Sequence, residues 1–234
     1  MKKPDLWRVL DRSADRLICL CLLIVILTAS YAAYDAGWLL DHAKDPTLRD
    51  HRPGDPQELV SEKSISEDQV AWLVIDDTSI DYPVMQADNN MEYLNKDPYG
   101  EFSLSGSIFL DYRNSPQFSD EYSILYGHHM ENGILFGALD HFRDTDYTQS
   151  HREGSIITKE GSFRFTVFCV TEADARESGL FAPTGREQAL ERLKEQPLFY
   201  EEPQEGSLVA LSTCIGAANT RRLMVVGTIK KDEE

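Results

Sequence analysis

The stretch Leu211-Ser212-Thr213-Cys214 ends a predicted β-strand near the C-terminus and places a thiol at the end of that strand. A loop of mostly small residues, 215–220, separates it from a second apolar run, which opens with Arg221-Arg222. Two strands joined in this way bring a thiol close to a guanidinium group. Because a nearby positive charge lowers the pKa of a thiol from its ordinary value of about 8.5, the pattern is typical of a reactive cysteine. Free cysteines are also often buried as small hydrophobic residues, so Cys214 alone does not settle the function.

Upstream, the segment Glu121–Met130 carries two histidines in a predicted strand. Side chains alternate between the faces of a strand, so His128 shares one face with Tyr126, and His129 shares the other with Gly127. Only one of the two histidines can therefore contact a site on a given face. Histidine is the most frequent general acid and base in enzymes, which makes catalysis the stronger interpretation of Cys214.

Three motifs resemble the His, Cys and Arg signatures of sortases, the membrane-anchored transpeptidases of Gram-positive bacteria. They are Tyr126-Gly127-His128, Leu211-Ser212-Thr213-Cys214 and Arg222-Leu-Met-Val-Val-Gly227. The segments Ile80–Gln86 and Gly106–Asn114, and a helix-like insert before the cysteine strand, are similar to class B sortases in particular. The resemblance covers roughly residues 71–231.

The resemblance implies a catalytic role for each of three residues. Cys214 would be the nucleophile, and His128 would protonate the departing amine and later deprotonate the incoming one. Arg222 would hold the substrate backbone and stabilise the developing negative charge, because an arginine does not release its proton at ordinary pH. Arg222 is chosen over Arg221 by its spacing to Gly227, and the alternative that Arg221 binds the substrate stays open.

The resemblance also implies the substrates. The enzyme would cleave a C-terminal sorting motif of surface proteins after Thr, form a thioacyl intermediate on Cys214, and pass the acyl group to an amine of peptidoglycan or of its lipid-linked precursor. Ser212 lies two residues before Cys214 and so faces the same way. Ser212 and Thr213 are the candidate substrate-binding residues, although an inert serine at a strand end fits the pattern equally well.

Short apolar runs between turn signals predict a mostly β fold, closed or sandwiched. Strands are expected at 71–75, 81–84, 107–111 and in a hairpin whose turn lies at Glu160-Gly161. Helices are expected around 90–94, over 133–142 and after Thr184. The sortase resemblance sharpens the fold to an eight-stranded β-barrel with peripheral helices, over residues 71–234.

The N-terminal part of the chain has the pattern of a membrane anchor. Residues 1–16 are basic, and residues 17–34 are apolar and without charge up to Ala33, which is near the lower limit of the about 17–25 residues that span a bilayer. Basic residues before the span favour a cytoplasmic N-terminus and an extracellular catalytic domain. A cleaved signal peptide is the competing interpretation. Residues 35–70 are expected to form an extracellular stalk with an amphipathic helix over 56–70.

Composition excludes other classes of function. The formal net charge of −17 argues against nucleic-acid binding, which needs a basic surface. Cys19 and Cys21 lie in the apolar segment and Cys169 in an alternating strand, so Cys214 is expected to be the reactive thiol of a protein without a disulfide framework. The histidines show no spacing typical of a metal site, and we expect neither a metal nor another cofactor.

Three alternatives stay open. Water could replace the amine, which would make the protein a hydrolytic cysteine peptidase, although papain-like enzymes carry their cysteine before their histidine and this chain has the opposite order. The chain could belong to another sortase class, such as one that polymerises pilins. It could also be a catalytically silent, membrane-tethered binding module, and indifference of activity to Cys214→Ala would favour that interpretation.

Overall fold

The computed structural model describes residues 6–43, 46–53, 63–130, 133–176, 179–214 and 220–232. The chain divides into two compact units, residues 1–44 and 45–234. Helix α1 (Leu6–Ala43) occupies the first unit and contains one candidate membrane span, Ala14–Tyr34, with a mean hydropathy of 2.4. At about 1.5 Å per residue, α1 is longer than the hydrocarbon core of a bilayer, about 30 Å. The helix therefore contains the predicted span and continues into the predicted stalk.

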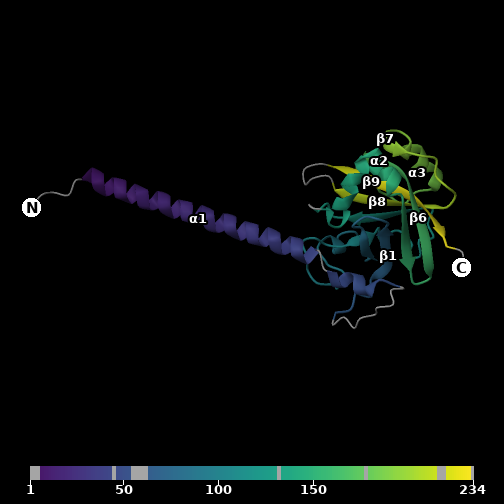
Figure 1. Ribbon diagram of the computed structural model, residues 1–234, viewed down its shortest axis with the longest axis horizontal. Helices are drawn as coiled ribbons and strands as arrows, with labels where there is room; N and C mark the ends of the chain where they lie inside the picture. Colours follow the sequence, from purple (N-terminus) through teal and green to yellow (C-terminus); the bar gives the residue numbers. More distant parts are fainter. Residues whose placement is uncertain are drawn as a thin grey trace, which may run out of the picture. The chain divides into compact units, whose positions relative to one another are not determined.

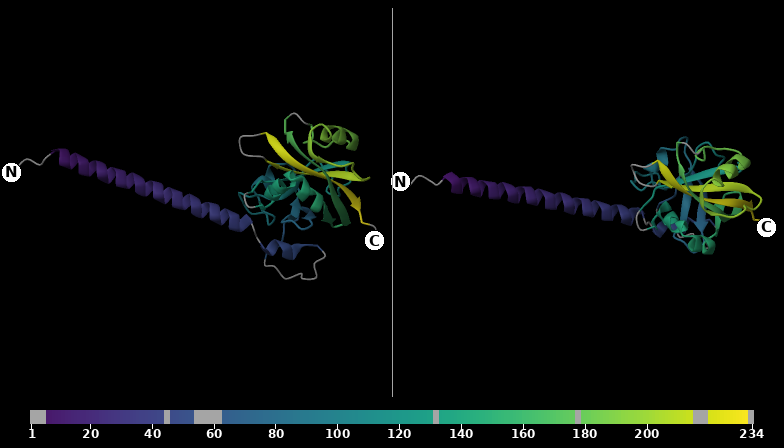
Figure 2. Two further views of the ribbon diagram at one scale, coloured as in Figure 1. Left: turned by 45° about the horizontal axis from the view of Figure 1, so that its top comes forward. Right: turned by 90° about the horizontal axis from the view of Figure 1, so that it is seen from above.

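The second unit is a mostly β domain (Figures 1 and 2). Its elements, in chain order, are η1 (Pro46–His51), β1 (Gln69–Ile75), β2 (Asp81–Met85), η2 (Glu92–Leu94), β3 (Ile108–Leu110), β4 (Tyr122–Gly127), η4 (Phe136–Arg143), α2 (Thr145–Ser150), β5 (Glu153–Thr158), β6 (Gly161–Asp174), α3 (Arg186–Leu193), β7 (Pro197–Tyr200), β8 (Ser207–Cys214) and β9 (Arg221–Lys231). The sheet order is β5-β1-β2-β3-β4-β8-β9-β6-β7, and β5 also pairs with β6. That last pairing closes eight strands into a barrel and leaves β7 outside the ring, so the predicted eight-stranded barrel is confirmed.

The direction of pairing brings particular strand ends together. β4 runs parallel to β8, whereas β9 runs antiparallel to β8. Because the carboxyl ends of parallel strands meet at one edge of a sheet, the ends of β4 and β8 lie at the edge where β9 begins. The long strands β6 and β9 cross the domain side by side beyond β8 (Figure 2).

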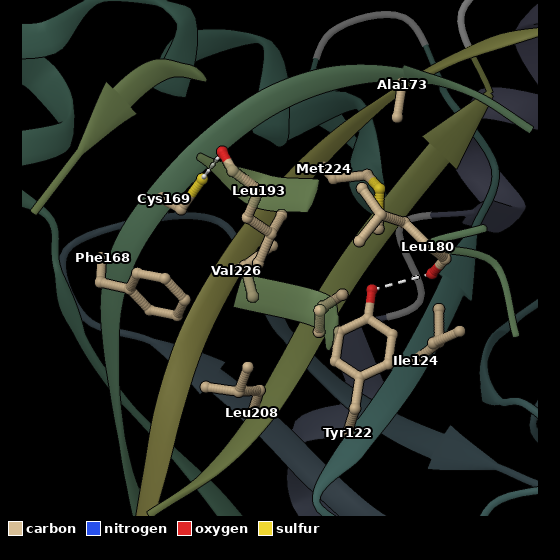
Figure 3. Packing of buried hydrophobic residues seen from close by; sticks show 12 residues of the cluster. Tyr122, Ile124, Phe168, Cys169, Ala173, Leu180, Leu193, Leu208, Met224 and Val226 are labelled. Atoms are coloured by element: carbon tan, nitrogen blue, oxygen red, sulfur yellow. Dashed lines mark hydrogen bonds between the residues drawn. The ribbon is translucent and has the colours of Figure 1, made fainter. Parts of the chain in front are cut away.

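The outer face of β4, β8 and β9 is covered by α3 and by the segment that precedes it. Figure 3 shows the apolar side chains that fill this layer. The Tyr122 hydroxyl donates to the Leu180 carbonyl at 2.9 Å and ties that segment to β4. From α3, Ala189 and Leu193 are fully buried in the layer. Cys169 also lies there, fully buried, as its strand pattern predicted.

The helix expected over 56–70 is wrong where it can be compared. Residues 54–62 lie outside the described residues, whereas 63–68 contain a bend and a turn but no helix, and 69–70 belong to β1. Gln69 pairs with Met85 across β1 and β2, and its amide donates to the Ser66 carbonyl, so strand pairing prevails over the helical pattern. The 3-10 helix η1 packs on the domain instead, with Leu48 against Trp72 and its neighbours.

The remaining helix predictions are correct in place but not always in type. The segment expected over 133–142 is a 3-10 helix, η4, which begins at Phe136, and η2 and α3 form close to their predicted positions.

Pro83 lies in β2 opposite Trp72 of β1, and β3 pairs with β2 only from Val84 onward. Pro83 therefore occupies a position of β2 that has no partner residue in β3, where its missing N–H is tolerated.

Candidate active site

Three adjacent strands bring the predicted catalytic residues to one edge of the barrel. Gly127 ends β4 opposite Thr213 of β8. The residues that follow this pair are His128 after β4 and Cys214 at the end of β8. On the other side of β8, the backbone of Cys214 pairs with Arg222 of β9. The three residues thus occupy neighbouring positions, although they are far apart in the sequence.

His128 is held by a main-chain carbonyl. It is half-buried just beyond the end of β4, and its Nε2 atom lies 2.8 Å from the Leu94 carbonyl oxygen. A carbonyl oxygen only accepts hydrogen bonds, so Nε2 carries the proton and Nδ1 is the ring atom available for proton exchange. The carbonyl therefore selects both the orientation of the ring and its tautomer.

The Leu94 carbonyl is itself enclosed by a glycine turn. Gly106 has a φ of +61°, and a Cβ added there would lie 2.5 Å from the Leu94 oxygen. Next to it, the Ser107 amide donates to the Tyr93 carbonyl at 3.0 Å. Only a glycine fits this turn without displacing the carbonyl that holds His128.

His129 contacts a different part of the domain. Its Nε2 atom lies 2.6 Å from an Asp140 carboxylate oxygen of η4, and Arg143 approaches the other oxygen of that carboxylate at 3.4 Å. The backbone of His129 forms an isolated bridge with Leu135. The two histidines therefore have separate environments: His128 contacts the Leu94 carbonyl, and His129 contacts Asp140 of η4.

The two adjacent arginines also differ. Arg222 is half-buried opposite Cys214 on one side and Ala173 of β6 on the other. Arg221 is exposed, and its guanidinium forms an ion pair with Glu172 at 3.0 Å. Burial raises the pKa of Tyr126, and the positive charge of Arg222 acts against that rise, so Arg222 lies within electrostatic reach of the Tyr126 hydroxyl. This geometry favours Arg222 over Arg221 as the site residue.

Ser212 and Thr213 are both fully buried but belong to opposite faces of β8. Ser212 pairs with Tyr126 of β4 and with Met224 of β9, whereas Thr213 pairs with Gly127 and Leu223. Neither hydroxyl has a hydrogen-bond partner among the described residues. Both hydroxyls are enclosed in the domain, that of Ser212 on the face of Tyr126 and that of Thr213 on the face of Gly127.

Tyr126 and Asp111 are residues that the sequence reasoning missed. Tyr126 lies two positions before His128, and its hydroxyl donates to the Asp111 carboxylate at 3.2 Å. Asp111 is fully buried. The available signal was Asp111-Tyr-Arg113 itself, which places two opposite charges two residues apart directly after an apolar strand.

The part of the chain that the structure describes contains no group of three or more His, Cys, Asp or Glu side chains arranged for a metal ion. The candidate site combines a strand-end cysteine, an oriented imidazole and a guanidinium. Such a set can generate a thiolate, move a proton and stabilise an oxyanion, the three requirements of acyl transfer through a thioester.

A family model, a curated relative and solved structures all match this chain to sortases. A sortase domain family model matches residues 73–230. Sortase B of Listeria monocytogenes serovar 1/2a (strain EGD-e) is 32% identical over 164 residues, 67% of either chain. Among solved structures, the class B sortase Spy0129 of Streptococcus pyogenes is 40% identical with a TM-score of 0.65, over 71% of this chain and 94% of Spy0129. The Staphylococcus aureus sortase B–substrate complex is 28% identical with a TM-score of 0.67, over 72% and 82%.

Proposed function

This chain belongs to the sortase family as a class B sortase, a cysteine transpeptidase, and from this premise we propose that Cys214, His128 and Arg222 carry out its acyl transfer. The observation that supports these roles most directly is the strand register. It places Arg222 opposite Cys214, and it makes His128 and Cys214 the next positions after the Gly127–Thr213 pair. Ser212 is proposed to donate its buried hydroxyl to the substrate, and Thr213 to contribute only main-chain contacts.

In the first half-reaction, the Cys214 thiolate adds to the carbonyl carbon of a Thr residue in the sorting motif. Arg222 stabilises the negative charge that develops on the carbonyl oxygen. As the C–N bond breaks, the departing amine takes a proton from Nδ1 of the His128 imidazolium, while Nε2 keeps its hydrogen bond to Leu94. The products are a thioester on Cys214 and a neutral histidine.

In the second half-reaction, an acceptor amine attacks the thioester. His128 takes the proton that the amine loses at Nδ1, and the C–S bond breaks to regenerate the Cys214 thiolate. A new amide bond joins the surface protein to the acceptor. Atoms and charge balance over the cycle, and no cofactor takes part.

Sortases act on surface proteins that carry a sorting signal and on cell-wall precursors. For this chain we infer an amine of peptidoglycan or of its lipid-linked precursor as the acceptor. A second candidate acceptor is a pilin lysine, because Spy0129, the solved structure with 40% identity, is described as involved in pilus biogenesis.

The proposed setting is the outer surface of the cell membrane. Helix α1 would cross the membrane through residues 17–34, with the basic residues 1–16 in the cytoplasm and the barrel outside. Protease added to intact protoplasts should digest residues 45–234 and spare the N-terminus. Digestion of the N-terminal segment, or a mature protein that begins after Ala33, would overturn this arrangement.

The catalytic proposal is tested with the full-length protein in detergent micelles and fluorogenic peptides randomised around a central Thr. Triglycine or Nα-acetyl-lysine is added as the acceptor, and products are identified by mass spectrometry. We expect an acyl adduct on Cys214 and an amide product. A higher rate with triglycine would favour a peptidoglycan amine as the acceptor, and a higher rate with Nα-acetyl-lysine would favour a pilin lysine. Cys214→Ala should form neither product. Equal turnover by Cys214→Ala would refute the assignment of the nucleophile.

A further inference from the structure

A buried carboxylate organises the region next to Tyr126. Asp111, which follows β3, is fully buried, and its amide donates to the Ile124 carbonyl of β4 at 2.9 Å. One carboxylate oxygen accepts from the amide and Nε of Arg113, at 3.0 and 2.8 Å. The other accepts from the second arm of Arg113 at 2.7 Å, from Asn90 at 3.0 Å and from the Tyr126 hydroxyl at 3.2 Å.

This set of bonds explains why a charge persists there. Burial acts to raise the pKa of Asp111, but the hydrogen bonds from Arg113 and Asn90 outweigh burial and hold the pKa below its ordinary value. A buried carboxylate is tolerated only when such partners surround it. The carboxylate therefore stays ionised and fixes three side chains from three segments of the chain.

Arg113 connects the Asp111 carboxylate to the segment before α3, and we call Asp111 with its bound Arg113 the anchor. The guanidinium arm that binds Asp111 also donates to the Phe181 carbonyl at 2.9 Å. The preceding carbonyl, that of Leu180, accepts from the Tyr122 hydroxyl (Figure 3). Two consecutive carbonyls of the segment 179–185 thus accept hydrogen bonds, one from Arg113, which follows β3, and one from Tyr122 of β4. A guanidinium can serve a carboxylate and a carbonyl at once because its donors have a fixed planar geometry.

The anchor lies beside the catalytic positions. Tyr126 pairs with Ser212 and precedes His128 by two residues. The positive charge of Arg222 acts to lower the pKa of the Tyr126 hydroxyl. Its ring also contacts Phe109 of β3, with a centroid distance of 5.5 Å. Movement of Asp111 or Arg113 would therefore be transmitted to Tyr126 on one side and to the segment 179–185 on the other.

We infer that Asp111 and Arg113 are positioning residues for the transpeptidase reaction: they hold the segment 179–185 against Tyr126 so that the sorting peptide meets a preformed surface. The inference rests on the proposed function of Cys214, His128 and Arg222. It deepens that function, because it assigns peptide positioning to the Asp111–Arg113 ion pair, whose guanidinium also binds the Phe181 carbonyl. Loss of the second arm of Arg113 should therefore weaken peptide use without changing the thiol.

The test compares Arg113→Lys and Arg113→Met with the wild type, as full-length proteins in detergent micelles. Lysine can still pair with Asp111 but cannot hold the Phe181 carbonyl with the same fork. We expect kcat/KM for the best fluorogenic Thr peptide to fall roughly 10–100-fold, mainly through KM. The rate at which iodoacetamide alkylates Cys214 should stay within about twofold of wild type, because the variants leave the thiol untouched. Added guanidinium ion should restore part of the peptide activity of Arg113→Met.

Arg152→Met is the matched control. Arg152 also joins a carboxylate, Glu201 at 2.5 Å, to a main-chain carbonyl, Val167 at 2.9 Å. Val167 pairs with Gly227 of β9, well along the strand from Arg222. This variant should therefore keep the KM of the wild type.

The outcomes separate the two proposals. Absence of turnover by the wild type, or full turnover by Cys214→Ala, would refute the proposed function. An active wild type with Arg113 variants of unchanged KM would refute the positioning role alone. Equal losses in the Arg113 and Arg152 variants, or failure of Arg113→Lys to fold, would make the ion pair a stability element and would also overturn the inference.

Discussion

Cys214 and Arg222 are directly paired residues of the antiparallel ladder between β8 and β9. The pairing fixes the backbone separation of the two positions by main-chain hydrogen bonds, so it does not depend on the intervening loop. Residues of one antiparallel pair have their side chains on the same face of the sheet. The proposed function uses this pairing, because it would bring the guanidinium of Arg222 to a substrate carbonyl attacked by Cys214.

The two arginines give a direct test of this pairing. Arg222→Gln should lower kcat about 10²–10³-fold, the usual cost of removing one donor to an oxyanion. Arg221→Gln should change kcat less than about threefold, because Arg221 is exposed and its ion pair with Glu172 lies at the surface. Steady-state kinetics with the fluorogenic peptide measure both. A larger effect of Arg221→Gln would assign the substrate-binding role to Arg221.

The adjacent histidines provide a second pair of variants. His128→Ala should lower kcat about 10²–10⁴-fold, because proton transfer to the departing amine is lost. His129→Ala should retain most activity, since its imidazole contacts Asp140 of η4. Steady-state kinetics with the same peptide and acceptor amine measure both variants. The opposite result would mean that the ring of His129 serves the thiol.

Sequence reasoning reached the residues whose chemistry is carried by their type and local spacing. Cys214 and Arg222 lie on consecutive strands, so a strand-loop-strand pattern was enough to bring them close. The parallel pairing of β4 with β8 joins segments far apart in the chain, and only the sortase resemblance supplied it. The barrel followed from the same resemblance, whereas the residues alone left a sandwich open.

The contacts that orient the site could not be predicted for a physical reason. His128 is held by the main-chain carbonyl of Leu94, and Arg113 by that of Phe181. Every residue has such a carbonyl, so the amino-acid type at positions 94 and 181 does not reveal these contacts. The expected helix failed over residues 63–70, the described part of the range 56–70, for a related reason. Pairing of Gln69 with Met85 depends on a distant strand, and it outweighed local helical periodicity.

The glycine turn around Leu94 gives a prediction on a residue outside the reaction. Gly106→Ala should reduce kcat several-fold or more, because its Cβ would displace the Leu94 carbonyl that orients His128. Gly100 is the matched control. It also has a positive φ, +89°, but a Cβ there meets nothing within 4 Å. The positive φ alone should cost either variant about 1–2 kcal/mol of stability, and Gly106→Ala should lose more than Gly100→Ala because its Cβ would also meet main-chain atoms of Tyr93 and Leu94. Equal kcat values for the two variants would show that the carbonyl does not control His128.

Alkylation should distinguish the two thiols of the barrel. Cys169 is fully buried, and burial raises its pKa to about 12. At pH 8 its thiolate fraction would be about one part in 10⁴, so iodoacetamide should spare it. Mass spectrometry of residues 45–234, which form a compact unit, should show one label, located on Cys214. The Cys214→Ala variant should take up none until urea unfolds it. Rapid labelling of Cys169 in the folded unit would contradict the buried layer beneath α3.

Asp111 gives a prediction on acid stability, because its pKa in the folded protein lies below the ordinary value of 3.8. The folded state therefore binds the proton less readily than the unfolded chain, and the ionised carboxylate contributes stability above about pH 4. This contribution is lost as the pH falls from about 4 through the lower pKa of the folded state. Asp111→Asn should destabilise residues 45–234 by about 2–3 kcal/mol at pH 7, somewhat less than a fully buried pair because Arg113 is partly exposed.

The same substitution should flatten the pH dependence. Urea unfolding of residues 45–234 at pH 7 and at about pH 3 would give the free energy of unfolding of each protein. The difference between the wild type and Asp111→Asn should shrink at the lower pH, because the wild-type carboxylate is then protonated in part and its bonds to Arg113 weaken. Asp140, paired with His129 and Arg143, also has a lowered pKa and remains in both proteins, so it cancels in the comparison. A difference that grows toward acid pH would mean that Asp111 is neutral in the folded enzyme.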